Sequence, residues 1–315
     1  MVGPDEPGRD EPGRDEPGRD EPGGDETVAG GPGAGGRGAS AAVPDEPDAH
    51  AMDVGDSGAD APGFGDVPRG GRADGESGTW FRPLADHMGE TYLRYSFTKG
   101  TDQEADFLVG LLDLGTETRV LDAGCGPGRH VRALRARGVP TVGVDLAESF
   151  CRLVVHGDSP APAAVADVRA LPTHPAFDAV ISLCQGGFGL LGGPGAPLDA
   201  DVAAVRQLAS ALRPGGRLVL SAFSSYFQVR HQADEGGEFD VDAGVMHERT
   251  QVKDRAGTDL DADLWTTGFT PRELRLVTRL AGLEPDHVWS VDPGDYARRT
   301  PDLDHAEFLL LAHKP

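Results

Sequence analysis

Cysteine and long apolar runs are scarce in this 315-residue sequence, and each scarcity excludes a class of protein. The three cysteines, Cys125, Cys151 and Cys184, are widely spaced and form neither a disulfide framework nor a metal-ligand pattern, which favours a reducing, cytoplasmic setting and no metal. The apolar run at 308–312 is far shorter than the ~18 residues that cross a bilayer. Since the N-terminus has no basic segment followed by an apolar one, we expect neither a secretory signal nor a membrane partner.

Positive charge is scarce as well: 29 basic residues face 52 acidic ones, for a net charge of −23. Affinity for nucleic-acid backbones comes mainly from cationic contacts, so we expect no nucleic-acid partner. Residues 1–79 hold 19 acidic residues against 6 arginines, with 20 glycines, 10 prolines and only 8 large apolar residues. Such a segment buries too little apolar surface to offset the entropy of ordering, which predicts a disordered acidic tail. Residues 80–315 then form one folded domain.

The tail begins with a five-residue repeat, Asp-Glu-Pro-Gly-Arg, at 5–9, 10–14 and 15–19, with a variant at 20–24. Proline and glycine in every unit exclude a helix. Two interpretations remain open. The tail is either an arm for a basic protein partner of unknown identity or, as we favour, a solvated extension produced by repeat expansion.

Beyond residue 80, apolar periodicity predicts strands that alternate with helices. Strands are expected at 119–123, 141–144, 163–166, 177–183 and 217–223, and helices at 101–114, 129–137 and 199–212. A helix at 270–281, with Thr270 as its cap and Glu273 three residues later, and closing strands at 283–291 and 305–312 follow. Thr101, three residues before Glu104, is expected to cap the helix at 101–114. We predict an α/β, Rossmann-like doubly wound fold whose mostly parallel, seven-stranded sheet carries helices on both faces.

The segment 224–268 breaks this alternation after the fifth strand. It contains two expected strands, 245–253 and 258–267, separated by a short polar turn with a glycine. That pattern indicates an inserted β-hairpin. We expect this insertion to form a cap over the ligand pocket.

A glycine-rich turn follows the first expected strand. Residues 122–128 read Asp-Ala-Gly-Cys-Gly-Pro-Gly, and glycine lets the backbone turn sharply and approach a ligand closely. A dinucleotide fingerprint would need a third glycine at position 129, which is arginine, and this disfavours a nicotinamide-dependent oxidoreductase. Asp145, at the end of the second strand, is placed to accept both hydroxyls of a ribose, and Asp167, after the third strand, to accept an adenine amino group.

These motifs resemble those of the class I S-adenosylmethionine-dependent methyltransferases, most closely over residues 118–223. The similar segments are 120–128, 143–145, 166–172, 177–182 and 212–218, in the order of the family's motifs. The resemblance implies a cytoplasmic enzyme that transfers a methyl group from S-adenosyl-L-methionine to a small-molecule acceptor. The Asn/Asp-Pro-Pro-aromatic motif of DNA and protein-amide methyltransferases is absent after the fourth strand. Residues 92–100 resemble the N-terminal lid of small-molecule members, so the domain would have a lid at about 80–100.

The resemblance also implies which residues hold the cofactor. The glycines would line its methionine moiety, Asp145 its ribose, and Asp167 with Val168 its adenine. Cys184 and Gln185 would lie beside the transferring methyl group. The full implied set is Asp122, Gly124, Cys125, Gly126, Gly128, Asp145, Leu146, Asp167, Val168, Cys184 and Gln185.

A general base is not assignable from the sequence. Because methyl transfer from a sulfonium is an in-line displacement with a good leaving group, positioning supplies much of the rate enhancement. His231, His247 and Tyr92 are candidate catalytic residues, and a surface or packing role is the alternative for each. The alternative function is a non-catalytic regulatory protein that binds S-adenosylmethionine.

Overall fold

The computed structural model describes residues 80–171, 174–184, 186–193, 196–232 and 237–315. The expected acidic tail and Gln185 therefore lie outside the described residues. Among the helices of the described part, none is long and apolar enough to cross a membrane.

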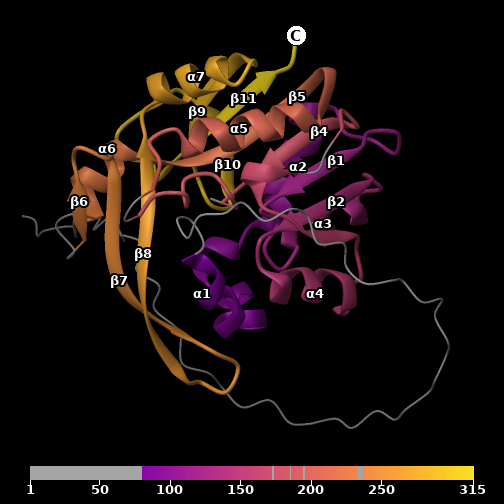
Figure 1. Ribbon diagram of the computed structural model, residues 1–315. Coiled ribbons are helices and arrows are strands. Elements are labelled where there is room, and N and C mark those ends of the chain that lie inside the picture. Colours follow the sequence, from indigo (N-terminus) through magenta and orange to yellow (C-terminus); the bar gives the residue numbers. More distant parts are fainter. Residues whose placement is uncertain (1–79, 172–173, 185, 194–195, 233–236) are drawn as a thin grey trace, which may run out of the picture. The chain divides into compact units, whose positions relative to one another are not determined.

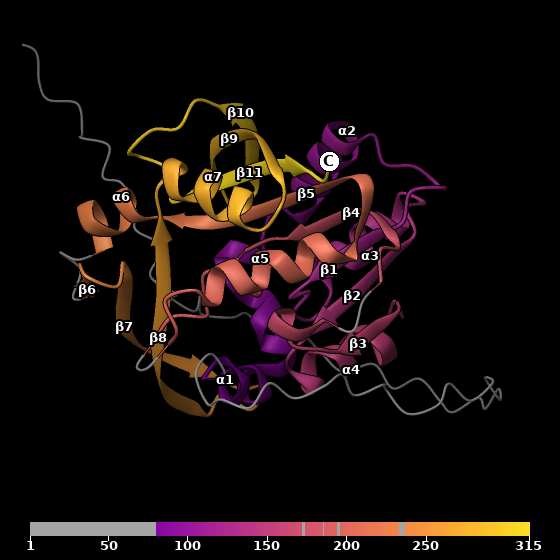
Figure 2. The ribbon, with the colours of Figure 1, turned by 45° about the horizontal axis from the view of Figure 1, so that its top comes forward.

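The central sheet has the strand order β10-β9-β11-β5-β4-β1-β2-β3, and Figure 2 shows its parallel half from β5 to β3. Strands β1 to β5 pair in parallel, whereas β11 is antiparallel to β5 and β9, and β10 is antiparallel to β9. The strands are β1 (Val120–Ala123), β2 (Thr141–Asp145), β3 (Ala163–Val165), β4 (Phe177–Ser182), β5 (Leu212–Ser224), β9 (Glu284–Asp292), β10 (Asp295–Arg299) and β11 (Glu307–His313). The expected α/β class with a mostly parallel sheet is confirmed.

Strand β10 is additional to the seven strands expected from the sequence. It follows β9 through a tight turn in which Gly294 has a φ of 78° after Pro293. Proline followed by glycine favours such a reversal, because proline fixes its own φ and glycine accepts a positive one. The strand is short and carries charged residues, so its sequence has no apolar alternation.

Successive residues of each central strand enter two different cores. Leu121, Leu218 and Leu310 belong to one apolar cluster, and their neighbours Val120 and Val219 belong to the other. Side chains of a strand alternate between its faces, so each face of the sheet is covered. The helices that cover them are α2 (Thr101–Leu112), α3 (Arg129–Ala136), α4 (Glu148–His156), α5 (Ala200–Ala211) and α7 (Pro271–Leu280), with a 3-10 turn η3 (Val168–Ala170).

The two expected helix caps have different outcomes. Thr270 forms a complete capping box with Glu273 at the start of α7. The expected cap at Thr101 is wrong: Gly100, with a φ of 92°, is the N-cap residue of α2, and the Thr101 hydroxyl donates to the Thr98 carbonyl at 2.9 Å. Glu104 does not return to the helix start, because its carboxylate is buried in an ion pair with Arg129.

The expected hairpin is present as β7 (Val245–Lys253) and β8 (Asp259–Phe269), preceded by α6 (Ser225–Phe227), η4 (Gln228–Gln232) and the short β6 (Glu238–Asp240). Residues 80–98 fold as α1 (Phe81–Met88), η1 (Gly89–Arg94) and η2 (Ser96–Thr98). Leu84 and Met88 of α1 pack against Val252 and Ala262 of the hairpin. Figure 1 shows α1 beside this hairpin.

Candidate functional site

The glycine-rich turn between β1 and α3 has the backbone shape that its sequence predicts. Gly124, Gly126 and Gly128 have φ values of 75°, 53° and 83°. The N–H groups of Gly124 and Cys125 both donate to the Val144 carbonyl, at 2.8 and 2.9 Å, which ties the turn to β2. These positive φ values explain why the turn requires glycine.

A pocket lies at this turn, beside the carboxyl ends of β1, β2 and β4, where doubly wound sheets bind their ligands. Of the residues that the sequence predicted to contact a cofactor, those that line the pocket are Gly124, Gly126, Asp145, Leu146, Asp167, Val168 and Cys184. Asp122, Cys125 and Gly128 do not line it, and Gln185 lies outside the described residues. Cys125 instead packs against Gly143 of β2.

Asp145 is nearly buried and is held by backbone donors on both sides. Its Oδ2 accepts the N–H of Gly126 and its Oδ1 the N–H of Ala147, each at 2.8 Å. Burial raises the pKa of its carboxyl to about 6, although these two hydrogen bonds act in the opposite direction. The carboxylate thus links the glycine-rich turn to the start of α4 at the edge of the pocket.

Asp122 lies deeper, at 1% exposure, and its Oδ2 has no hydrogen-bond partner among the described residues. Burial, opposed by the charge of Arg129 and assisted by the nearby Asp145 carboxylate, raises the pKa of its carboxyl to about 7. A buried carboxylate oxygen without a hydrogen bond is costly, and it favours positive charge nearby.

Asp167 is already bound to a neighbouring cation. The Arg169 guanidinium donates to Oδ1 and Oδ2 at 3.0 and 2.7 Å, and the Arg169 N–H donates to Oδ1 at 2.8 Å. Burial alone would raise the pKa of this carboxyl, but the contacts with Arg169 lower it below its ordinary value. An adenine amino group at this position would share the carboxylate with the guanidinium.

Aromatic side chains form another wall of the pocket. Phe81 and Tyr92 come from α1 and η1 and Phe150 from α4, and the Tyr92 ring lies 6.3 and 5.1 Å from the other two ring centroids. Burial raises the pKa of the Tyr92 phenol far above its ordinary value. The phenol is therefore an unsuitable general base near neutral pH, and its packing beside Gly126 accounts for its position.

Neither candidate histidine lines the pocket. The ring of His231, in η4, packs on Phe227 at the end of α6, with the ring centroids 4.6 Å apart. The His247 ring stacks on Trp265 at 5.0 Å, and its Nε2 lies 2.8 Å from Asp263 Oδ1. Both histidines belong to the insertion that was expected to cover the pocket. In the described structure, neither of them lies at the glycine-rich turn. No group of three or more His, Cys, Asp or Glu side chains suited to a metal ion occurs in the described ranges.

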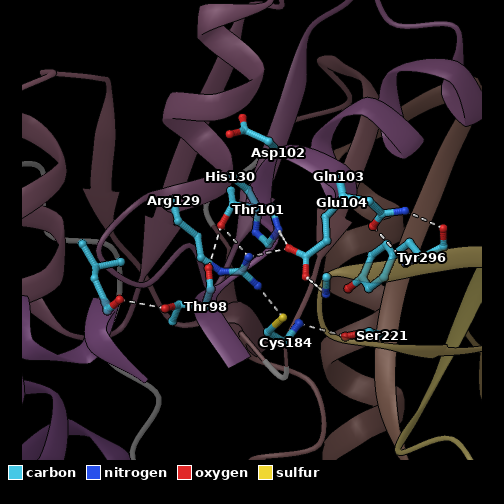
Figure 3. A network of polar contacts seen from close by, with 12 residues as sticks. Thr98, Thr101, Asp102, Gln103, Glu104, Arg129, His130, Cys184, Ser221 and Tyr296 are labelled. Carbon is cyan, nitrogen blue, oxygen red and sulfur yellow. Dashed lines mark hydrogen bonds and ion pairs between the residues drawn. The ribbon is translucent and has the colours of Figure 1, made fainter. Parts of the chain in front are cut away.

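A buried polar network that the sequence patterns did not predict lies next to the pocket (Figure 3). Glu104 is fully buried, forms an ion pair with Arg129, and lies 2.7 Å from His130 Nε2. Arg129 also donates to Cys184 Sγ at 2.6 Å. One sequence signal for this network exists: Glu104 occupies the same helical stripe as the buried Leu108 and Leu111, where an acid requires a partner.

Comparisons with known proteins agree with this fold. Residues 120–216 match a family described as a methyltransferase domain. A tRNA U34 carboxymethyltransferase from Pseudoalteromonas translucida is 36% identical over 107 residues, and this match covers 32% of the chain but only 30% of that relative. The CcbJ methyltransferase from Streptomyces caelestis has a TM-score of 0.59 at 18% identity, over 73% of this chain and 97% of that one. An S-adenosylmethionine-dependent methyltransferase from Clostridium acetobutylicum has a TM-score of 0.54 at 15% identity, and the match covers 74% of this chain and 97% of that one.

Proposed function

We propose that this chain, a class I S-adenosylmethionine-dependent methyltransferase, transfers a methyl group to a small-molecule acceptor. Its cofactor is S-adenosylmethionine, which supplies an electrophilic methyl group on a sulfonium. The choice of acceptor is supported by a cover built from α1, η1 and the β7–β8 hairpin, of which α1 and η1 supply residues that line the pocket. The Thr91 hydroxyl donates to the Lys253 carbonyl at 2.7 Å, and His87 Nε2 lies 2.9 Å from the Thr258 carbonyl.

The same cover reaches the pocket itself. Phe81 and Tyr92 line it, and the Trp80 indole donates to the carbonyl of Leu190, another lining residue, at 3.2 Å. A covered pocket of this kind admits a compact acceptor and excludes water from the reacting groups. Residues 80–315 also carry 33 acidic against 23 basic residues, which disfavours a polyanionic acceptor such as RNA.

The chemistry of the pocket residues supports this cofactor. We assign the ribose hydroxyls to Asp145, the adenine to Leu146, Asp167 and Val168, and the methionine end to Gly124 and Gly126. The glycines of this turn have no side chains, so the backbone approaches a ligand directly at those positions. Buried carboxylates on this side of the sheet compensate the positive charge of the cofactor. The chain's contribution to catalysis is then orientation of the two reactants.

Replacing Asp145 with alanine is expected to weaken binding of S-adenosylhomocysteine at least 30-fold, about 2 kcal/mol, because charge-assisted hydrogen bonds to the ribose are lost. Titration calorimetry on the wild type and Asp145→Ala measures the change. Asp286→Ala is the matched control, since its carboxylate makes an exposed contact with His313 at the end of β11 and does not line the pocket. A wild type that does not bind, or an Asp145→Ala variant that binds as well as the wild type, would contradict the cofactor assignment.

The acceptor class is tested with cofactor labelled on its methyl group. We expect label to appear in a product of low molecular weight when the enzyme is incubated with a cell metabolite extract. Label that appears instead in purified transfer RNA would replace the small-molecule acceptor with an RNA. The absence of label from every fraction, after binding has been shown, would favour the non-catalytic alternative.

A further inference from the structure

We infer that Arg129 is a positioning residue for the methyltransferase site, because it holds Cys184 in the conformation that shapes one wall of the cofactor pocket. The inference rests on the proposed function. Arg129 is the first residue of α3 and does not line the pocket, whereas Cys184 follows β4 and does. The two side chains meet in the buried network of Figure 3.

Cys184 has a backbone conformation that requires support. Its φ is 48°, and Asp113, at the end of α2, is the other residue besides glycines with a positive φ in the described ranges. This left-handed conformation is unfavourable for a residue with a Cβ. The Cys184 N–H donates to the Ser221 hydroxyl at 2.8 Å, which fixes the backbone on the β5 side.

Arg129 fixes the same residue through its side chain. Nη2 of the guanidinium donates to Cys184 Sγ at 2.6 Å, while Nη1 donates to the Thr101 hydroxyl at 2.9 Å and to Glu104. One planar group therefore reaches the thiol and the carboxylate at the same time. A lysine ammonium has no such fork.

Glu104 is the anchor of this arrangement. Its side chain is 0% exposed, its Oε1 accepts the Gly294 N–H at 2.8 Å, and its Oε2 contacts Arg129 and His130. Both carboxylate oxygens are thus engaged. The additional strand β10, which begins after Gly294, is in this way connected through α2 and Arg129 to the pocket wall.

A shift of Cys184 would also displace the glycine-rich turn, because Gly186 lies between the two. The Gly186 N–H donates to the Leu183 carbonyl at 3.0 Å, and the Gly186 backbone packs directly on Gly124. Both Gly124 and Gly186 line the pocket. Release of the thiol from Arg129 would therefore loosen the wall against which the cofactor lies.

The first test is Arg129→Lys, which keeps a cation next to Glu104 but loses the contact with Cys184. We expect the Kd for S-adenosylhomocysteine to rise about tenfold. We also expect iodoacetamide to alkylate Cys184 about tenfold more slowly, because burial raises the pKa of this thiol and the guanidinium that opposes the increase no longer contacts it. Cys125 and Cys151, at 6% and 0% exposure, serve as internal references in the same sample. If Arg129 served only to neutralise Glu104, the Kd and the alkylation rate of Cys184 would both stay unchanged.

The second test varies Cys184, so that the buried ion pair remains intact. Cys184→Ser keeps an acceptor for the guanidinium and is expected to bind within about threefold of the wild type, whereas Cys184→Ala is expected to lose about tenfold. When Cys184→Ala is combined with Arg129→Lys, the loss of affinity is expected to remain about tenfold, because both substitutions break the same interaction. Additive losses, or unchanged alkylation and Kd in Arg129→Lys, would overturn the inference. Failure of the wild type to bind would overturn the cofactor assignment instead.

Discussion

Replacing Gly124 with alanine is expected to abolish binding of S-adenosylhomocysteine and to lower the free energy of unfolding by about 3 kcal/mol or more. A Cβ at this position would lie 0.6 Å from the carbonyl oxygen of Gly186 and 1.7 Å from its carbon. The φ of 75° adds the strain of a left-handed residue with a side chain. Because the obstacle is backbone, no rotamer change relieves it. Titration calorimetry and thermal unfolding measure the two effects.

Gly110→Ala is the matched control for this substitution. Gly110 lies inside α2, and a Cβ there meets no atom within 4 Å. Alanine is the better helix former, so we expect this variant to be more stable by about 0.5–1 kcal/mol and to bind S-adenosylhomocysteine normally. If Gly124→Ala unfolded and bound like the wild type, the close packing of Gly124 against Gly186 would be refuted.

The parts of the fold that local sequence patterns predict are those determined by short-range rules. Alternation of apolar strands and helices predicts the parallel half of the sheet, and the positions of Gly124 and Gly126 predict the turn at its carboxyl edge. Thr270 and Glu273 likewise lie three residues apart and form their cap. In each case the interacting residues are neighbours in the sequence or belong to one repeating unit.

The parts that the sequence did not predict depend on partners far apart in the chain. Glu104 looked like the second half of a helix cap, but Arg129 and Gly294 supply a better-buried set of donors. Strand β10 has no apolar alternation and is fixed by the side chain of Gln103, which bonds the backbone of Tyr296 at 2.8 and 2.9 Å. Spacing rules do not encode such long-range contacts, and the cover formed by α1 and the hairpin depends on them as well.

Asp122→Asn is expected to stabilise the ligand-free protein relative to the wild type, and to do so more at pH 8 than at pH 5. The carboxyl is 1% exposed, and burial raises its pKa to about 7 in the folded state. The ordinary pKa of an aspartate is about 4 in the unfolded chain. Between about pH 4 and about pH 7, Asp122 is therefore ionised in the unfolded chain but protonated in the folded chain, so the free energy of unfolding falls as pH rises.

The size of this effect follows from the pH window. Between pH 5 and about pH 7 the wild type loses roughly 3 kcal/mol through Asp122, at about 1.4 kcal/mol for each pH unit, and an asparagine does not titrate. The difference in unfolding free energy between Asp122→Asn and the wild type should therefore increase by that amount. Chemical denaturation at pH 5, 6, 7 and 8 measures it, and the subtraction removes any constant cost of the amide.

Asp167→Asn provides a control of opposite sign. Despite burial, Arg169 holds the pKa of that carboxyl below its ordinary value, so its contribution to stability is present above the ordinary pKa and is lost only at lower pH. Asp167→Asn should destabilise the protein by a nearly constant amount from pH 5 to pH 8. A constant difference for Asp122→Asn as well would show that its carboxylate has a partner in solution. An increasing difference would mean that the fold retains an unstable buried charge, which a cationic cofactor is suited to neutralise.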